Sequence, residues 1–207
     1  MIERPDLAAI TIAALVLGAA ALPVVRTFAP GRRWSWPIRT IVAAQTALSW
    51  GIACLLPPPW AYLGLILAWC LLVLALVDYL ELRLPDRLTL PLTGLGLLTS
   101  LTIDGGDPVA SGLGAVAGYG IFTLIAWLYR RLRGLDGLGQ GDAKLLAACG
   151  AWLGWPGLAP VVLTASLLAL AVLLVHRFVT HRPIAPHEAF PFGPFLCGGF
   201  WLVWVLG

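Results

Sequence analysis

Charged side chains are scarce in this sequence. Of its 207 residues, 60% are hydrophobic and only 11% are charged, and the mean hydropathy is +0.91. An average soluble domain has about 25% charged residues, so this composition indicates a membrane protein. The longest polar-rich segments, 26–37, 130–142 and 176–190, are too short to bury a core of their own. We therefore expect one membrane-embedded domain over residues 1–207 and no soluble domain.

Cysteine is also scarce, and it never occurs in pairs. Cys54, Cys70, Cys149 and Cys197 lie singly in apolar stretches, without the C-x-x-C spacing of a zinc or dithiol site. We interpret them as small core residues. The sequence also lacks a Ser-His-Asp spacing, an H-E-x-x-H motif and a P-loop. The sequence therefore lacks the signatures of serine proteases, zinc proteases and nucleotide-driven pumps, and nothing in it supports nucleic-acid binding.

Apolar runs dominate the sequence, and they lack the strict alternation of a transmembrane barrel. Short breaks rich in turn residues, such as Pro57-Pro58-Pro59, separate them. The eight runs cover residues 7–25, 38–56, 60–77, 88–103, 109–129, 143–154, 157–175 and 190–206. The first run lacks the basic flank and short apolar core of a signal peptide, so we expect it in the mature chain. The predicted fold is an all-α membrane protein, a polytopic bundle of about eight transmembrane helices.

The distribution of basic residues predicts the orientation of this bundle. With the N-terminus outside, twelve of the thirteen Lys and Arg residues fall on the inner side, and only Arg4 lies outside. The inner set is Arg26, Arg32, Arg33, Arg39, Arg83, Arg87, Arg130, Arg131, Arg133, Lys144, Arg177 and Arg182. One helix too many or too few would move the later basic residues to the other side, so the asymmetry supports both the helix count and the orientation.

Two acidic residues stand at apolar run ends on the same inner side. Asp78 closes the third run, and Asp142 opens the sixth, after Gly139 and Gly141. Glycine adopts backbone angles closed to other residues, so we expect a sharp turn that presents Asp142 in the first helical turn. The sixth run, 143–154, spans only about 18 Å as a helix, against about 30 Å of hydrocarbon. We predict a short sixth helix and a recessed, wet position for Asp142.

Ionisable residues at membrane depth indicate function by default, although each Asp would also suit a solvated or capping role at a helix end. Helix dipoles favour an acid at the N-terminal position of Asp142 and disfavour one at the C-terminal position of Asp78. Two close carboxylates share one proton, which these dipoles would place on Asp78. Such a dyad activates water and protonates a leaving group, as in aspartic proteolysis.

An alternative of another class is a small proton-coupled transporter that uses Asp78 and Asp142 as a relay. Against it, both acids lie at one membrane face, whereas transporter sites gather near the midplane. The three histidines, His176, His181 and His187, lie in one basic inner segment and are interpreted as solvated or facing lipid headgroups.

The residues around the two acids form longer motifs. The first is Asp78-Tyr-Leu-Glu-Leu-Arg-Leu-Pro85-Asp86-Arg-Leu-Thr-Leu-Pro91-Leu, the second is Gly139-Gln-Gly-Asp142-Ala-Lys144-Leu-Leu-Ala-Ala, and the third is Pro191-Phe-Gly-Pro-Phe-Leu196. They resemble the type IV prepilin leader peptidases, membrane aspartic proteases of the GxGD type, over roughly residues 60–207. Around the acids we expect Gly139, Gly141, Lys144, Pro85 and Pro91 to shape the site, with Pro91, Gly94 and Gly96 bending their helix.

The resemblance implies an endopeptidase of the inner membrane that removes the short basic leader of prepilins and pseudopilins at the cytoplasmic face. Its catalytic aspartates match Asp78 and Asp142, it needs no metal or other cofactor, and its partners are prepilin-like substrates and membrane lipids. Many members carry a cysteine-rich insert linked to N-methylation between their first two helices. Here that loop, Arg26 to Pro37, is about a dozen residues without cysteine, so we expect peptidase activity alone. Leu138 replaces a frequent Met, without an expected consequence.

Overall fold

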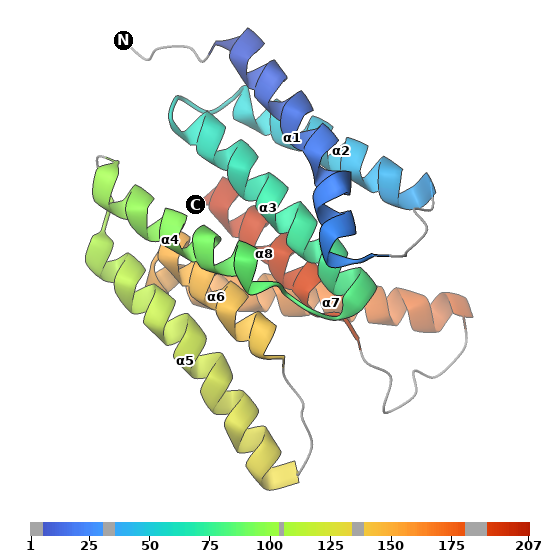
Figure 1. Ribbon diagram of the computed structural model, residues 1–207. Helices are drawn as coiled ribbons and strands as arrows, with labels where there is room; N and C mark the ends of the chain where they lie inside the picture. The colour runs from blue at the N-terminus through green and yellow to red at the C-terminus, as the bar shows by residue number, and fades with distance from the viewer. Residues whose placement is uncertain (1–5, 31–35, 104–105, 134–138, 181–189) are drawn as a thin grey trace.

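The computed structural model describes residues 6–30, 36–103, 106–133, 139–180 and 190–207, and within them the chain is helical throughout (Figure 1). The helices are α1 (Leu7–Phe28), α2 (Trp36–Ala53), α3 (Trp60–Glu81), α4 (Asp86–Thr102), α5 (Pro108–Arg133), α6 (Gln140–Leu153), α7 (Leu158–Thr180) and α8 (Gly193–Leu206), with a single 3-10 turn, η1 (Trp155–Gly157), before α7. Each of the eight predicted runs corresponds to one helix. The all-α class and the short sixth helix, of 14 residues, are confirmed.

Four segments of the described chain are long and apolar enough to cross a membrane. They are Leu7–Phe28, Trp60–Glu81, Pro108–Leu132 and Trp155–Val179. The last helix, Gly193–Leu206, is apolar but shorter. With a mean hydropathy of up to 2.6 in these spans, the structure confirms a multi-pass membrane protein.

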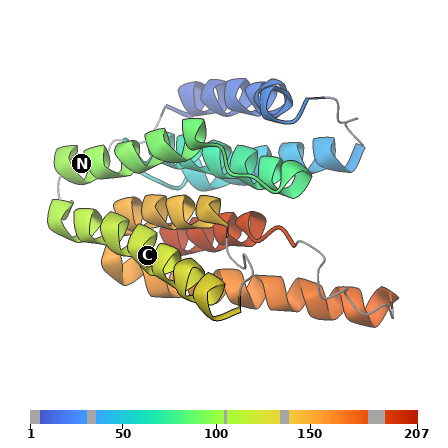
Figure 2. The same cartoon turned by 60° about the horizontal axis from the view of Figure 1, so that its bottom comes forward.

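The helices pack around α3, α6 and α8. Helices α1 and α2 contact each other and one side of α3, and α8 contacts α3, α6 and α7. Helices α4 and α5 both pack on α6. Figures 1 and 2 show the resulting stack, in which α1 and α2 lie at one side of the bundle and α7 at the other. The short helix α6 is therefore held inside the bundle by the longer helices α4 and α5 and by the equally short α8.

The main hydrophobic core lies where α3, α6 and α8 meet. Leu67, Leu74, Leu145, Leu196 and Phe200 are fully buried there. A second cluster, which includes Val25 and Val73, packs α1 and α2 against α3. Because lipid tails are as apolar as leucine, packing rather than escape from water holds such a bundle together.

Small residues allow that close packing between helices. A Cβ atom on Gly114 of α5 would lie 2.5 Å from the Gly150 carbonyl oxygen of α6, and one on Gly118 would lie 2.5 Å from the Leu146 carbonyl oxygen. Glycine at these positions lets the α5 and α6 backbones touch, as small residues do in membrane interfaces generally. Gly96 similarly makes room for the Trp152 ring, whose Nε1 donates to the Leu92 carbonyl of α4 at 2.9 Å.

Side-chain caps begin two of the long helices. Asp6 Oδ1 accepts hydrogen bonds from the Ala8 and Ala9 amides at the start of α1. Asp107 Oδ1 accepts from Val109 and Ala110 at the start of α5, where Pro108 occupies the first helical position. An acidic cap followed by proline is a favoured way to begin a helix.

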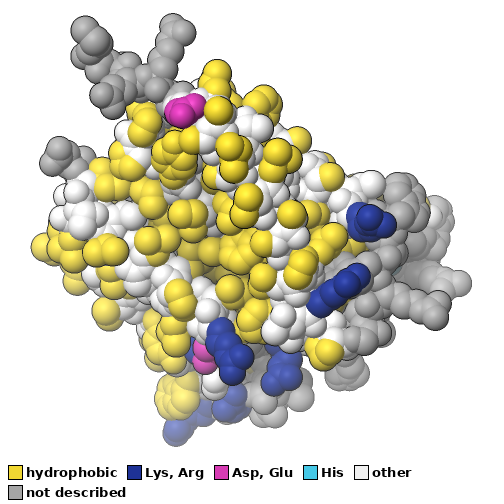
Figure 3. Space-filling model, turned by 45° about the horizontal axis from the view of Figure 1, so that its top comes forward, with side chains coloured by type: hydrophobic (Ala, Val, Ile, Leu, Met, Phe, Trp, Pro, Cys, Tyr) yellow, Lys and Arg dark blue, Asp and Glu magenta, His cyan; other side chains and the backbone are white. Residues whose placement is uncertain are grey.

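The surface has the polarity of a membrane protein. Figure 3 shows one face that is mostly hydrophobic, with the basic side chains visible in this view along its right and lower edges. Large apolar side chains such as Leu15, Val116 and Phe178 are more than 60% exposed. Exposed apolar faces of this extent are expected where a helix meets lipid.

Candidate active site

Asp78 lies in the last turn of α3. Its backbone carbonyl accepts a hydrogen bond from the Leu82 amide at 2.8 Å, and Leu82 ends the helix with a left-handed backbone, φ 53° and ψ 40°. The side chain of Asp78 is only 7% exposed. A buried carboxylate requires compensating polar contacts, so its surroundings decide its role.

Asp142 is the third residue of α6, which follows the N-cap Gly139. Its amide donates to the Gly139 carbonyl at 3.1 Å, and its half-buried carboxylate accepts a hydrogen bond from the Gly139 backbone amide. An acidic side chain at this third position commonly bonds back to the N-cap amide. The first turn of α6 thus presents Asp142 as the sequence predicted.

The reason for the two glycines differs from the predicted one. Gly139 has φ −71° and ψ 135°, an extended conformation open to any residue, and Gly141 is inside the helix. The expectation of unusual backbone angles was wrong for both. At Gly141 the requirement is space, because a Cβ atom there would lie 2.8 Å from Leu84 Cβ. Without a side chain at Gly141, α6 can approach the segment between α3 and α4.

The two acids converge from α3 and α6. Their carboxylates are close enough for the charge of Asp78 to act on Asp142. Both charges also reach the buried thiol of Cys197 on α8. The fold therefore brings together two carboxylates separated by 64 residues in the chain (142 − 78), one near the end of α3 and one near the start of α6.

A third element, the start of α8, completes the surroundings of Asp78. The Gly193 amide donates to Asp78 Oδ2 at 2.9 Å in a buried position. Asp78 thus lies at the C-terminal end of its own helix and also against the N-terminal end of α8. Because the N-terminal end of α8 favours charge on Asp78 while the C-terminal end of α3 disfavours it, the helix dipoles do not place the shared proton on Asp78.

Sequence reasoning did not place Gly193 at the site. It identified the motif Pro191 to Leu196 only as part of the resemblance. The available signal was Pro194, because proline in the first turn marks a helix start, and a helix start presents free amides to an acid.

Lys144 forms an ion pair, with Nζ 2.6 Å from Asp86 Oδ1. Asp86 stands near Arg83 and Arg87 in the sequence, but the partner of its ion pair comes from α6. Pro85 is the N-cap of α4, and its carbonyl accepts from the Leu88 and Thr89 amides. These contacts join the start of α4 to the start of α6 beside Asp142.

Pro91 lies inside α4, which continues through it to Thr102. The predicted bend at Pro91 stays a prediction. His176 lies near the end of α7, while His181, His187 and Leu138 lie outside the described residues. Among the residues that the structure describes, His, Cys, Asp and Glu side chains do not gather into a group of three that could hold a metal ion.

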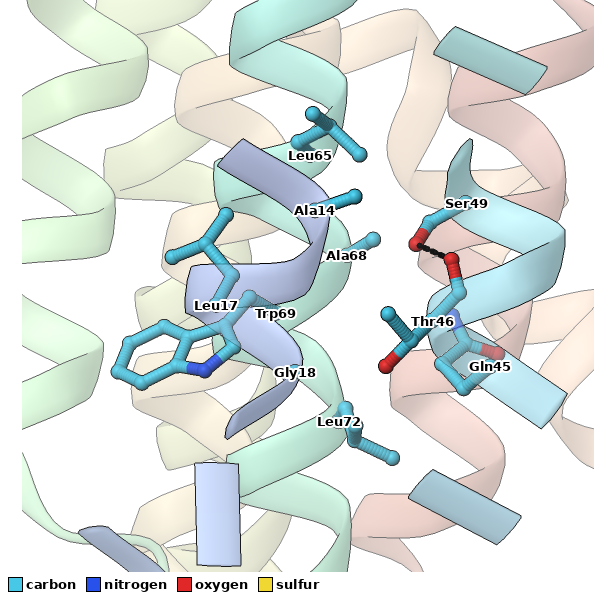
Figure 4. A pocket seen from close by; sticks show the side chains of 10 residues that line it. All are labelled: Ala14, Leu17, Gly18, Gln45, Thr46, Ser49, Leu65, Ala68, Trp69 and Leu72. Carbon is cyan, nitrogen blue, oxygen red and sulfur yellow. Dashed lines mark hydrogen bonds between the residues drawn. The ribbon is translucent and has the colours of Figure 1, made fainter. Parts of the chain in front are cut away.

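Two hollows of the structure lie away from the aspartates. Figure 4 shows a pocket of about 10 Å³ between α1, α2 and α3, where Ser49 Oγ donates to the Thr46 carbonyl at 3.0 Å. A larger apolar groove of about 560 Å³ runs between α1 and α2, from Thr11 to Leu22 along α1. Neither is lined by Asp78 or Asp142, so the chemistry of the site rests on the carboxylates themselves.

A pair of adjacent carboxylates can perform general acid and base catalysis. One carboxylate accepts a proton from water while the other, protonated, donates to the group under attack. The same pair could pass protons in a transporter, but both acids lie at helix ends rather than in the middle of the spans. This placement favours hydrolysis over a relay at the midplane.

Known proteins are similar to this chain over most of its length. A model of the type IV leader peptidase family matches residues 65–174, a range that includes both aspartates. The prepilin leader peptidase/N-methyltransferase of Aeromonas hydrophila is 39% identical over 176 residues, covering 81% of this chain and 58% of that protein. The protein of the same name from Burkholderia pseudomallei (strain K96243) is 42% identical over 160 residues, covering 77% of this chain and 51% of that protein.

A third relative, the prepilin leader peptidase/N-methyltransferase of Dickeya chrysanthemi, is 41% identical over 169 residues, covering 79% of this chain and 56% of that protein. The chain therefore spans little more than half the length of the relatives it matches. No solved structure matches it.

Proposed function

The chain belongs to the type IV leader peptidase family, and from this premise we propose that it is a membrane-embedded aspartic endopeptidase. Its substrates are type IV prepilins and pseudopilins, from which it removes the short basic leader. The whole of residues 1–207 acts as one peptidase domain. The names of the relatives, prepilin leader peptidases, support this substrate class.

The observation that carries the proposal is the convergence of Asp78 and Asp142. Two acids from separate helices lie close enough for their charges to interact, at the same end of the bundle. Bringing two carboxylates together in a largely apolar protein costs free energy. A structural role would not require the second acid, whereas hydrolysis by a dyad requires both.

The dyad hydrolyses the peptide bond in two stages. One carboxylate takes a proton from a water molecule as the water oxygen bonds to the scissile carbonyl carbon, while the other donates its proton to the carbonyl oxygen. The tetrahedral intermediate then collapses as a proton moves to the amide nitrogen and the carbon–nitrogen bond breaks. The products are the leader, with a new carboxyl terminus, and the mature protein, with a new amine.

We further propose that the site faces the cytoplasm in the inner membrane, with the N-terminus of the chain outside. The support is the gathering of basic residues at the helix ends that carry the two acids. A leader on the cytoplasmic side of a substrate's apolar helix would meet the dyad at that face. Membrane lipids surround the exposed apolar helices.

Methyl transfer is not part of the proposed function, although the relatives' names include it. Only residues 29–35 lie between α1 and α2, and this segment has no cysteine. We therefore propose a peptidase that leaves the new amine unmodified.

Co-expression with a prepilin tests these proposals directly. Mass spectrometry of the recovered pilin would show loss of the leader with the wild-type chain and the full precursor with Asp78→Asn or Asp142→Asn, because an amide cannot take up or donate the catalytic proton. The same spectrum shows whether a methyl group has been added to the new amine.

Asp107→Asn is the matched control, because asparagine caps a helix as well as aspartate does and Asp107 lies at the far end of α5. This variant should process the precursor normally. Leader removal by either site variant would exclude the dyad, and an added methyl group would exclude the peptidase-only proposal.

A further inference from the structure

The first turn of α8 has an unusual set of backbone donors. Gly193 and Pro194 are its first two residues, after the N-cap Phe192. The amides of Phe195 and Leu196 both donate to the Phe192 carbonyl at 3.1 Å, and Pro194 has no amide hydrogen. Within this turn, Gly193 therefore supplies the one amide without a backbone partner.

That amide is aimed at Asp78. Its hydrogen bond to Asp78 Oδ2 is 2.9 Å long, is buried, and joins residues 115 positions apart. A helix N-terminus suits a carboxylate because the first amides and the helix dipole both favour an acceptor there. Among the described residues, the Asp78 carboxylate accepts no second hydrogen bond.

The lack of a side chain at residue 193 is a condition of this contact. A Cβ atom on Gly193 would lie 2.6 Å from Asp78 Oδ2 and 2.8 Å from its Cγ, closer than real Cβ contacts allow. Five residues along the same helix, a Cβ atom on Gly198 would meet only Leu168 Cδ1, at an ordinary 3.5 Å. Only the first of these two glycines is required by its neighbour.

We propose that Gly193 is a positioning residue for the dyad: its amide holds the Asp78 carboxylate by Oδ2, and its missing side chain leaves the space in which that carboxylate sits. This inference rests on the proposed peptidase function. It explains why a helix far along the chain begins with glycine and proline beside the site.

The hydrogen bond distinguishes the two oxygens of Asp78. An amide can only donate, so the oxygen that faces it acts as an acceptor. A proton exchanged with Asp142 or with water is then carried by Oδ1. Gly193 thereby fixes which oxygen takes part in proton transfer, and it acts through Asp78.

Amide exchange measures the bond without any substrate. In full-length protein labelled with ¹⁵N-glycine and with ¹³C at the phenylalanine carbonyl carbon, the Gly193 signal is assigned by its coupling to Phe192, because residues 192 and 193 form the only Phe-Gly pair in the sequence. We expect this amide to exchange slowly in the wild-type chain and at least about tenfold faster in Asp78→Ala, because its only acceptor is gone. Two controls apply. The Gly198 amide, in the interior of α8, should exchange at the same rate in Asp78→Ala as in the wild-type chain, and the Gly193 amide should exchange at its wild-type rate in Asp107→Ala. A Gly193 signal that Asp78→Ala leaves unchanged would overturn the proposal.

Kinetics measure the consequence of the bond. Displacing a catalytic group by about 1 Å can cost about 100-fold in rate, so Gly193→Ala should lower kcat for leader removal by about that factor and leave KM within twofold. Gly198→Ala, on the same helix, should keep both constants. A similar fall in kcat for both variants, or a change in KM alone, would refute the positioning role.

The amide-exchange and kinetic experiments distinguish a failure of the positioning role from a failure of the proposed function. If the wild-type chain does not cleave a prepilin, the proposed function fails, and the exchange of the Gly193 amide still decides whether it holds Asp78. If Gly193→Ala unfolds, as judged by its melting temperature against Gly198→Ala, the exchange measurement in Asp78→Ala remains decisive.

Discussion

At the scale of single residues, the site depends on two glycines without side chains as much as on the two acids. Gly141 and Gly193 have no side chain where a Cβ atom would strike Leu84 or Asp78. Each lets a helix end approach the dyad more closely than any other residue would permit. The acids can be recognised in the sequence by their type and position, whereas these glycines are explained only by their neighbours.

Replacing Gly141 with alanine should displace the start of α6. The new Cβ atom would lie 2.8 Å from Leu84 Cβ, which cannot rotate away because it is fixed to the backbone. We expect kcat for leader removal to fall by about tenfold to 100-fold, since small displacements of a catalytic group are costly. Gly120→Ala on α5 is the control, because nothing lies within 4 Å of a Cβ atom there. Equal activity of both variants would show that the close approach is unimportant.

The sequence predicted Asp78 and Asp142 because an acid at the end of an apolar run is rare and its helix end can be inferred from the pattern. It did not predict the Gly193 contact, which joins residues 115 positions apart. Periodicity and composition describe each helix alone and carry no information on how helices face one another. The same reason explains why the ion pair between Asp86 and Lys144, 58 positions apart, was not predicted from the sequence.

At the scale of helices, the pair formed by Lys144 and Asp86 connects α6 to α4. The two side chains are 26% and 54% exposed, so water and salt screen the pair. We expect the double-mutant cycle of Asp86→Asn and Lys144→Met to give a coupling of only about 0.2–1 kcal/mol in the free energy of unfolding. Chemical denaturation in detergent would measure it. A coupling above about 3 kcal/mol would mean that the pair is desolvated in the membrane.

The contact between α5 and α6 should be far less tolerant. A Cβ atom on Gly150 would overlap the Gly114 carbonyl, a backbone group that cannot move alone. Gly150→Ala is therefore expected to lower the free energy of unfolding by about 1–3 kcal/mol.

Thermal unfolding followed by circular dichroism would measure this loss of stability. The matched control is Gly112→Ala on α5, where no neighbouring atom lies within 4 Å of an added Cβ atom. If Gly150→Ala melts at the same temperature as Gly112→Ala, the two helices do not pack as tightly as described.

The helices themselves were largely predictable. Runs of apolar residues between Pro and Gly breaks gave all eight, and the observed ends differ by a few residues, as at α3, which continues from the predicted 77 to Glu81. That extension matters, because it places Asp78 inside the last turn of the helix instead of after it. Helix ends depend on caps such as the left-handed Leu82, which hydropathy does not register.

At the scale of the whole molecule, the eight helices explain how a short helix is accommodated. The 14 residues of α6 rise about 21 Å, less than the hydrocarbon thickness of about 30 Å. Helices α5, α4 and α8 pack on it, and its residues from Leu145 to Ala151 are buried, so protein covers the middle of α6. Near its N-terminal end, backbone amides of Gly139 and Gly193 donate to the two acids, contacts that lipid tails could not supply.

The orientation of the molecule is predicted from its charges and can be measured. The predicted topology puts twelve of the thirteen basic residues on the side that carries both acids, and positively charged segments tend to remain in the cytoplasm. In a chain whose four cysteines are replaced, a membrane-impermeant maleimide should label Asp107→Cys in intact cells and Arg131→Cys only after lysis. Both positions are exposed and lie at opposite ends of α5, so one helix supplies its own control. The reverse labelling would turn the dyad away from the cytoplasm and remove the leader from its reach, whereas the expected labelling places the carboxylates on the side where a leader would be presented.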